Sequence, residues 1–157
     1  MKALVVYDSA FGNTEQIARA IAQGVGEGTE VVRAGSVQPG QLTGLDLLIV
    51  GSPTQKFRPL PPVSELLKAM PRGSLNGVRV AAFDTRMTQA NVDAVRILAF
   101  FVKIFGYAAD PIAKRLVKAG GKLAAAPEGF YVEDTEGPLQ AGELERATAW
   151  GRRAAAE

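Results

Sequence analysis

The sequence predicts an α/β fold built on a parallel β-sheet. Short apolar segments typical of strands alternate along the 157 residues with segments of helical periodicity. The strand-like segments are continuously apolar, as in strands that are buried on both faces of a sheet. A chain of this length lies in the usual size range of one domain, so we expect residues 1–157 to form a single domain.

Three strands and two helices are expected in the first half of the chain. The strands are predicted over residues 3–7, 29–34 and 45–50. A helix is expected from Asn13 to about Gly26, because Ile17, Ile21 and Val25 repeat every four residues on one face. A second helix is expected to open at residues 61–62, since proline is tolerated in the first turn of a helix.

The second half continues the alternation and contains one interrupted strand. A fourth strand is predicted over residues 78–83, followed by helices over residues 90–105 and 111–119. The fifth strand is predicted over residues 122–126 and joined by residues 130–132; Pro127 and Gly129 interrupt it, so we expect an insertion to split it. A last helix is predicted over residues 142–155. Its apolar stripe comprises Leu144, Ala147, Gly151 and Ala154.

The composition excludes several classes of chemistry. The chain has no cysteine and no histidine, which rules out disulfides and cysteine nucleophiles and removes the commonest general base and metal ligand. We therefore expect no metal site. Lys and Arg total 18 against 16 Asp and Glu, a formal charge of +2. The positive charges are scattered, so nucleic-acid binding is not expected.

Nothing in the sequence predicts a membrane segment. The longest apolar run, residues 97–105, is interrupted by Lys103 and is too short to span a bilayer. The chain begins Met-Lys and enters its first predicted strand at once, without the pattern of a signal peptide. We expect a cytoplasmic protein.

Polar segments follow the first, third and fourth predicted strands. In open α/β sheets, ligands bind beyond the carboxyl ends of the strands, where the strand order reverses. The first segment, residues 8–14, offers hydroxyls, an amide and backbone N–H groups at a helix N-terminus, which suits an anion. It contains no Lys or Arg. The same residue types are ordinary helix N-caps, so this loop alone leaves both roles open.

The other two segments are also expected to be loops. Residues 51–59 carry two prolines, which stiffen the segment, together with hydroxyls, an amide and one aromatic side chain, Phe57. Residues 84–88 follow the fourth strand, and Asp84 could bind the ligand or cap the next helix. The P-loop pattern of nucleotide triphosphatases and the dinucleotide-binding glycine pattern are both absent.

Together these segments resemble the flavin-binding loops of flavodoxins. Residues 7–14 (YDSAFGNT), followed by Glu15, Ile17 and Ala18, are similar to the family's phosphate-binding loop and first helix. Residues 51–54 (GSPT) look like its second flavin loop, and residues 82–85 (AFDT) stand where the family places its third. The resemblance implies a flavodoxin-like three-layer sandwich with a doubly wound, five-stranded parallel sheet in the order 2-1-3-4-5.

The resemblance also implies noncovalently bound FMN and a set of cofactor-binding residues. It assigns the phosphate to the first loop, whose members are Ser9, Ala10, Phe11, Gly12, Asn13 and Thr14. It assigns the flavin ring to the second loop, through Ser52, Pro53, Thr54, Gln55 and Phe57. It places the third loop on the other side of the ring, through Asp84, Thr85, Arg86 and Met87.

Two departures from well-known flavodoxins concern the surroundings of the ring. Those proteins usually stack a Trp or Tyr on the flavin, whereas the third loop here has neither, leaving Phe57 or Met87. They are also acidic, whereas this chain is slightly basic. Lys56, Arg58 and Arg86 are expected near the ring, against Asp84 alone. Gln55 and Arg86 are expected on loops, where they would tune the flavin without carrying core packing.

The function implied is electron transfer between FMN and a redox partner protein, with no catalytic side chain. The alternative is an FMN-dependent NAD(P)H:quinone reductase, which needs a second pocket often completed by a dimer partner. Phe100, Phe101, Ile104 and Phe105 could form such an interface or pack in the core. We expect a monomer or a weak homodimer. A signalling receiver domain is excluded, since its phosphorylatable aspartate is replaced by Gly51-Ser52.

Overall fold

The parallel sheet predicted from the sequence is confirmed. The computed structural model describes residues 1–54, 58–87 and 107–156. The strands are β1 (Ala3–Tyr7), β2 (Glu30–Arg33), β3 (Leu47–Pro53), β4 (Arg79–Met87), β5 (Lys122–Leu123) and β6 (Glu128–Val132). They form one sheet in the order β2-β1-β3-β4-β5, and β6 also pairs with β4.

The fifth strand of this order is split, as the proline and glycine predict. Both β5 and β6 pair parallel with β4. Leu123 lies opposite Val80 and Glu128 lies opposite Phe83, so residues 124–127 stand opposite only Ala81 and Ala82. The extra residues leave the ladder between β5 and β6, and the carboxyl-terminal half of β4 is covered by β6.

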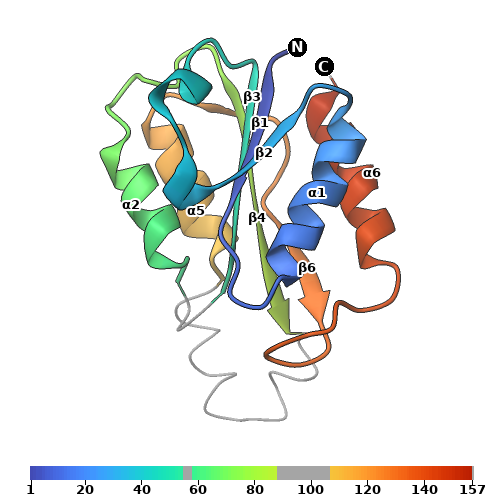
Figure 1. Ribbon diagram of the computed structural model, residues 1–157. Coiled ribbons are helices and arrows are strands. Elements are labelled where there is room, and N and C mark those ends of the chain that lie inside the picture. Colours follow the sequence, from blue (N-terminus) through green and yellow to red (C-terminus); the bar gives the residue numbers. More distant parts are fainter. Residues whose placement is uncertain (55–57, 88–106, 157) are drawn as a thin grey trace.

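Helices cover both faces of the sheet (Figure 1). The helices α1 (Asn13–Val25) and α6 (Glu143–Ala155) lie side by side on one face. The helices α2 (Pro61–Ala69) and α5 (Ala109–Lys118) cover the other. Two short 3₁₀ turns, η1 (Ala34–Ser36) and η2 (Pro39–Leu42), follow β2. The helix predicted over residues 90–105 and its apolar cluster, Phe100, Phe101, Ile104 and Phe105, lie outside the described residues.

Two apolar cores result from this layering, one on each side of the sheet. Neighbouring strand residues point to opposite faces, so Val5 packs in the core beneath α1 and α6 and Val6 in the core beneath α2 and α5. In the first core, Phe83, Phe130 and Trp150 contact one another edge to face, with ring centroids 6.1–6.3 Å apart. None of the described helices is long and apolar enough to cross a membrane.

Two strands extend beyond their predicted ends, and the buried face of one helix differs from its prediction. The strand β3 extends through Gly51, Ser52 and Pro53, and β4 runs on to Met87, because Ser52 pairs with Asp84 and β6 pairs with the far side of β4. The prediction that residues 84–87 form a loop is therefore wrong. On α6, Leu144 is exposed, and the buried stripe instead contains Trp150 beside Ala147, Gly151 and Ala154.

Candidate functional site

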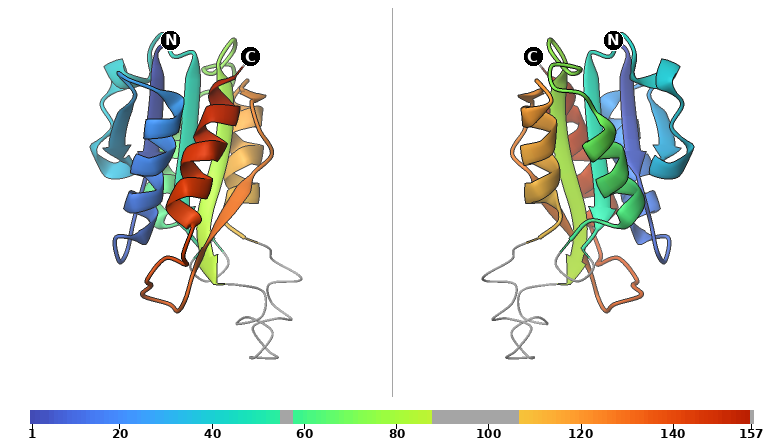
Figure 2. Two further views of the ribbon diagram at one scale, coloured as in Figure 1. Left: turned by 90° about the vertical axis from the view of Figure 1, so that its right-hand side faces the viewer. Right: turned by 90° about the vertical axis from the view of Figure 1, so that its left-hand side faces the viewer.

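The candidate site lies at the carboxyl edge of the sheet, where the chain leaves β1 and β3. These strands are neighbours: Tyr7 pairs with Gly51, and the backbone N–H of Asp8 donates to the Gly51 carbonyl at 3.2 Å. From β1 the chain continues to β2 on one side, and from β3 to β4 on the other. The strand order therefore reverses between β1 and β3, which is where ligands bind in open α/β sheets. Figure 2 shows this edge at the bottom of both views.

The loop between β1 and α1 is held by its own side chains. The Asp8 carboxylate accepts a hydrogen bond from the backbone N–H of Ser9 at 2.9 Å, and the Ser9 hydroxyl oxygen accepts one from the backbone N–H of Gly12 at 2.9 Å. Gly12 is the N-cap of α1 and has a φ of 92°, which a residue with a Cβ rarely adopts. The Ser9 hydroxyl keeps its own proton for a further acceptor.

This loop leaves a row of backbone donors at the start of α1. No side chain caps the helix, and its first intrahelical bond runs from Gln16 N–H to the Gly12 carbonyl at 3.2 Å. Within the described part of the chain, nothing accepts a hydrogen bond from the backbone N–H groups of the residues around Gly12. These are Ala10, Phe11, Asn13, Thr14 and Glu15. Unpaired N–H groups and the positive end of the helix dipole together favour an anion.

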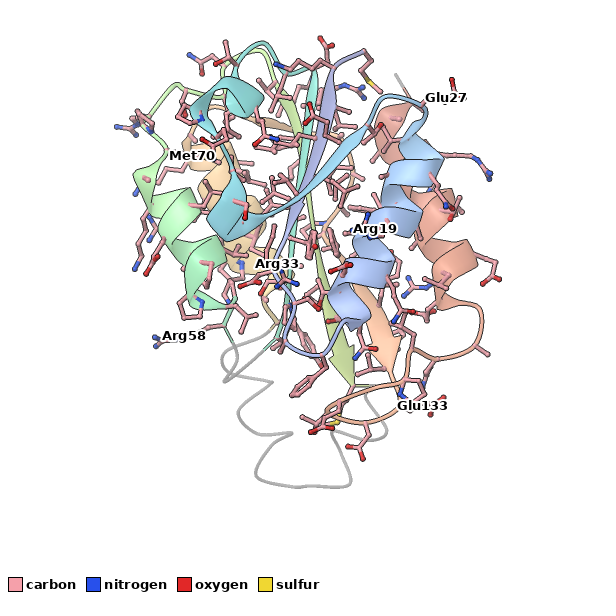
Figure 3. All side chains as sticks on the ribbon, in the orientation of Figure 1. Arg19, Glu27, Arg33, Arg58, Met70 and Glu133 are labelled. Atoms are coloured by element: carbon pink, nitrogen blue, oxygen red, sulfur yellow. The ribbon has the colours of Figure 1, made fainter. Side chains whose placement is uncertain are left out.

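A cation that the sequence did not predict lies beside this loop. Arg33 is the last residue of β2, and its guanidinium donates to Asp8 Oδ1 at 2.7 Å and to the Ser9 carbonyl at 3.1 Å. It lies between β2 and the start of α1 (Figure 3). Its position at the end of a predicted strand could have indicated that Arg33 lies near the first loop, because parallel strands end at one edge of the sheet.

Tyr7 and Glu15 complete the polar network beneath Arg33. The Tyr7 hydroxyl donates to Glu15 Oε1 at 2.9 Å, and the Arg33 guanidinium lies 5.2 Å from the centroid of the Tyr7 ring. The hydrogen bond from Tyr7 holds the pKa of Glu15 below its ordinary value, and burial raises the pKa of Tyr7. Glu15 is thus kept ionised near the start of α1 and balanced by Arg33 and Arg19.

Asn13 supports a neighbouring loop with its side chain. Its amide nitrogen donates to the Glu136 carbonyl at 3.1 Å, which ties the segment between β6 and α6 to the start of α1. Gly137 lies directly against the Asn13 amide, where a Cβ would come within 2.7 Å of it. Among the residues predicted to bind the phosphate, Asn13 therefore has only its backbone N–H available, because its side-chain amide is bonded to the Glu136 carbonyl.

Ser52 and Thr54 use their hydroxyl oxygens to shape the segment after β3. The Ser52 hydroxyl, fully buried, donates to the Pro53 carbonyl at 2.9 Å and accepts from Leu60 N–H at 2.8 Å. The Thr54 hydroxyl oxygen accepts from Ala108 N–H at 3.0 Å. Ser52 thus joins both ends of the segment that leads to α2. Gln55, Lys56 and Phe57 lie outside the described residues.

Two threonines connect the first and third predicted segments. The hydroxyls of Thr14 and Thr85 are 2.8 Å apart and both residues are buried. Thr85 also accepts a backbone hydrogen bond from Thr54 at 3.1 Å through its carbonyl. The structure therefore brings all three predicted segments together at one edge. Met87, at the end of β4, is half-buried and pairs with Val132.

Asp84 and Arg86 form a buried ion pair, which corrects the expectation that Arg86 is free of core packing. The guanidinium donates to both carboxylate oxygens of Asp84, at 2.6 and 2.7 Å, and Asp84 is fully buried. Asp84 also accepts from Ala109 N–H at 2.9 Å, so it caps α5. Burial raises the pKa of Asp84, and the Arg86 guanidinium and the Ala109 N–H oppose that rise.

Arg86 has aromatic and backbone neighbours as well. Its guanidinium lies 3.7 Å from the centroid of the Tyr107 ring, and it fills the space that a Cβ at Gly129 would need. Among the cations expected near the flavin ring, Arg86 is thus neutralised by Asp84, and Arg58 is exposed (Figure 3). Tyr107 is an aromatic residue near this edge that the sequence did not predict, because its place depends on the fold.

No group of three or more acidic side chains in the described ranges could hold a metal ion. The polar atoms of the edge instead form three structures. These are the donor row at α1, the Thr14–Thr85 bridge, and the Asp84–Arg86 pair. The donor row lies at the start of α1, the threonine bridge joins α1 to β4, and the ion pair lies on β4. The edge therefore combines a corner of backbone donors with a wall along β4 in which the charges of Asp84 and Arg86 are paired.

Comparisons with known proteins agree with this architecture. The family model described as Flavodoxin matches residues 5–150. Flavodoxin 1 from Bacillus cereus superposes with a TM-score of 0.74 at 19% identity, over 98% of this chain and 97% of that one. A flavodoxin from the domain Archaea superposes with a TM-score of 0.70 at 22% identity, over 99% and 96% of the chains.

A larger enzyme contains a similar fold as one part. Rubredoxin oxygen:oxidoreductase from Desulfovibrio gigas superposes with a TM-score of 0.73 at 19% identity, over 98% of this chain and 35% of that one. No curated protein sequence is significantly similar to this one.

Proposed function

Because the chain belongs to the flavodoxin family, we propose that it binds FMN noncovalently at the carboxyl edge of its sheet and passes electrons to a redox partner protein. The observation that carries this proposal is the uncapped start of α1. The backbone N–H groups of residues 10, 11 and 13–15 and the Ser9 hydroxyl are available there for a phosphate.

The chain's residues fit FMN in distinct roles. Ser9 and Thr14, with the backbone of Ala10, Phe11 and Asn13, would hold the phosphate, and Gly12 would supply the turn that arranges them. The segments after β3 and β4, with Pro53, Thr54, Gln55, Phe57, Thr85 and Met87, would border the ring. Ser52, Asp84 and Arg86 would fix the shape of that border, since their polar atoms bond within the protein. When bound, FMN would supply the electron-accepting and electron-donating group.

We expect the protein to bind one FMN and to prefer it to riboflavin at least tenfold. A charge-assisted hydrogen bond contributes about 1.5–3 kcal/mol, and each 1.4 kcal/mol is tenfold in affinity. Titration calorimetry with both ligands measures the ratio. Equal affinities would show that the start of α1 does not hold the phosphate. A spectrum without flavin absorbance after reconstitution would contradict FMN binding altogether.

Thr14→Val is expected to lower the affinity for FMN about tenfold and to leave riboflavin binding nearly unchanged. The substitution keeps the shape of the side chain and removes one hydroxyl that can donate to the phosphate. Thr85→Val is the matched control, because it breaks the same Thr14–Thr85 bond but keeps the Thr14 hydroxyl. An equal change in the FMN-to-riboflavin ratio for both variants would place Thr14 in packing instead of phosphate binding.

A further inference from the structure

Arg33 lies at the end of β2, outside the three predicted loops. Among the described residues outside those loops, it alone contacts two backbone or carboxylate groups of the first loop. Its side chain remains 44% exposed, so the guanidinium sits at the surface and not within a core. The contacts are to Asp8 Oδ1 at 2.7 Å and to the Ser9 carbonyl at 3.1 Å. The planar guanidinium thus donates hydrogen bonds to two adjacent residues of the loop.

The contact with the Ser9 carbonyl affects which groups the loop can present. A carbonyl oxygen carries partial negative charge and repels an anion, whereas the neighbouring N–H groups attract it. The Arg33 guanidinium donates a hydrogen bond to the Ser9 carbonyl from the β2 side of the loop. The Ser9 hydroxyl, bonded to Gly12 N–H, and the N–H groups of Ala10 and Phe11 remain for a ligand.

The contact with Asp8 affects the charge beside the same corner. Asp8 is 8% exposed and its carboxylate orders the loop by accepting from Ser9 N–H. Without a partner, that carboxylate would repel an anion bound at the neighbouring backbone donors. Glu15, on the first turn of α1, adds a second carboxylate, which Arg33 Nη2 reaches at 3.5 Å. Arg33 therefore pairs with both of these carboxylates.

We infer that Arg33 is a positioning residue that gives the first loop its preference for the phosphate-bearing form of the flavin. It acts by holding the Ser9 carbonyl and the Asp8 carboxylate away from the phosphate, and it need not touch the phosphate itself. This inference rests on the proposed binding of FMN at the start of α1. It adds a specificity role for the end of β2, an element outside the three predicted flavin-binding segments.

Arg19 offers a matched control on the same charge cluster. Its guanidinium pairs with Glu15 at 3.4 Å, as Arg33 does at 3.5 Å, but it makes no contact with Asp8 or Ser9. Arg19→Gln and Arg33→Gln each remove one positive charge beside Glu15. Only Arg33→Gln also releases the loop, so a comparison separates positioning from net charge.

The experiment measures dissociation constants of FMN and riboflavin for the wild-type protein and for Arg33→Gln, Arg33→Lys and Arg19→Gln. We expect Arg33→Gln to lower the FMN-to-riboflavin preference about tenfold. Arg33→Lys keeps the charge but loses the planar guanidinium, so it should retain part of the FMN-to-riboflavin preference that Arg33→Gln loses. Arg19→Gln should change the preference less than twofold, and all variants should keep the wild-type melting temperature within a few degrees.

The outcomes separate this inference from the proposed function. If the wild-type protein binds FMN no better than riboflavin, the phosphate site fails and the inference fails with it. If the wild-type protein prefers FMN and Arg33→Gln retains the full preference, only the role of Arg33 is overturned. Equal losses in Arg33→Gln and Arg19→Gln that vanish in 1 M salt would also overturn it, since they would show a screened charge effect without positioning.

Discussion

Arg86→Met is expected to lower the free energy of unfolding by about 3–5 kcal/mol, because it leaves a buried carboxylate without its partner. Asp84 is fully buried and receives two hydrogen bonds from Arg86 and one from Ala109 N–H. After the substitution only the backbone donor remains. The buried carboxylate must then either stay charged without a counter-ion or take up a proton, and both alternatives cost stability.

The measurement is urea unfolding of the flavin-free protein, followed by circular dichroism. Arg115→Met is the control, since Arg115 is an exposed arginine of α5 and its substitution should change stability by less than about 0.5 kcal/mol. The double variant Asp84→Ala with Arg86→Met should be less destabilised than Arg86→Met alone, because it removes the unpaired charge. A loss below about 1 kcal/mol in Arg86→Met would show that the pair does not hold β4 and α5 together.

This expectation differs from the one that the sequence supports for Arg86. Read as a loop residue, Arg86 would tune the flavin and leave the fold intact. In the structure it lies in β4, beneath Tyr107 and against Gly129, with its charge neutralised by Asp84. Its main expected effect is therefore on stability, and its effect on the flavin potential is reduced by the paired carboxylate.

Within the described residues, the sequence predicted most strands and helices well because their signals are local. The continuous apolar runs in β1 and β3, the four-residue repeat in α1, and the proline opening α2 each act within a few residues. The split of the last strand was also predictable, since proline removes a ladder donor. The first loop was found for the same reason: its small polar residues lie directly between a strand and a helix.

What the sequence missed depends on contacts between distant segments. The end of β4 is a strand only because β3 and β6 pair with its two sides, and neither partner is adjacent in the chain. Arg33 is 24 positions from Ser9, and the hydrogen bond between Asn13 and Glu136 spans 123 positions. Periodicity and composition do not encode such pairs, so these supporting residues were harder to predict than the polar segments that follow the strands.

The packing of α1 against α6 gives the second large expected effect. Each helix has a glycine where the backbone of the other helix comes close. A Cβ at Gly24 would overlap the carbonyl oxygen of Thr148, and a Cβ at Gly151 would overlap the carbonyl oxygen of Ile21. Backbone atoms cannot move aside as a flexible side chain does. Adding a methyl group at either position must therefore push the helices apart and open the core around Ile17 and Trp150.

Gly151→Ala and Gly24→Ala are each expected to destabilise the protein by about 3 kcal/mol, the upper end of the usual cost of overpacking. The sign of this stability change tests the close packing, because replacing glycine by alanine inside a helix ordinarily stabilises a protein by about 1 kcal/mol. Gly40→Ala is the control: no atom lies within 4 Å of a Cβ there and its φ is not positive, so stability should rise slightly or stay unchanged.

The double variant decides whether the two glycines act through one contact. If each methyl group separates the same pair of helices, the first substitution already makes room for the second. The combined loss should then be clearly smaller than the sum of the single losses. If the stability losses measured by urea unfolding add up fully, each end of the helix interface adjusts independently of the other. Stabilisation by either single variant would contradict the close approach itself, and with it the placement of α1 that brings its free N–H groups to the carboxyl edge of the sheet.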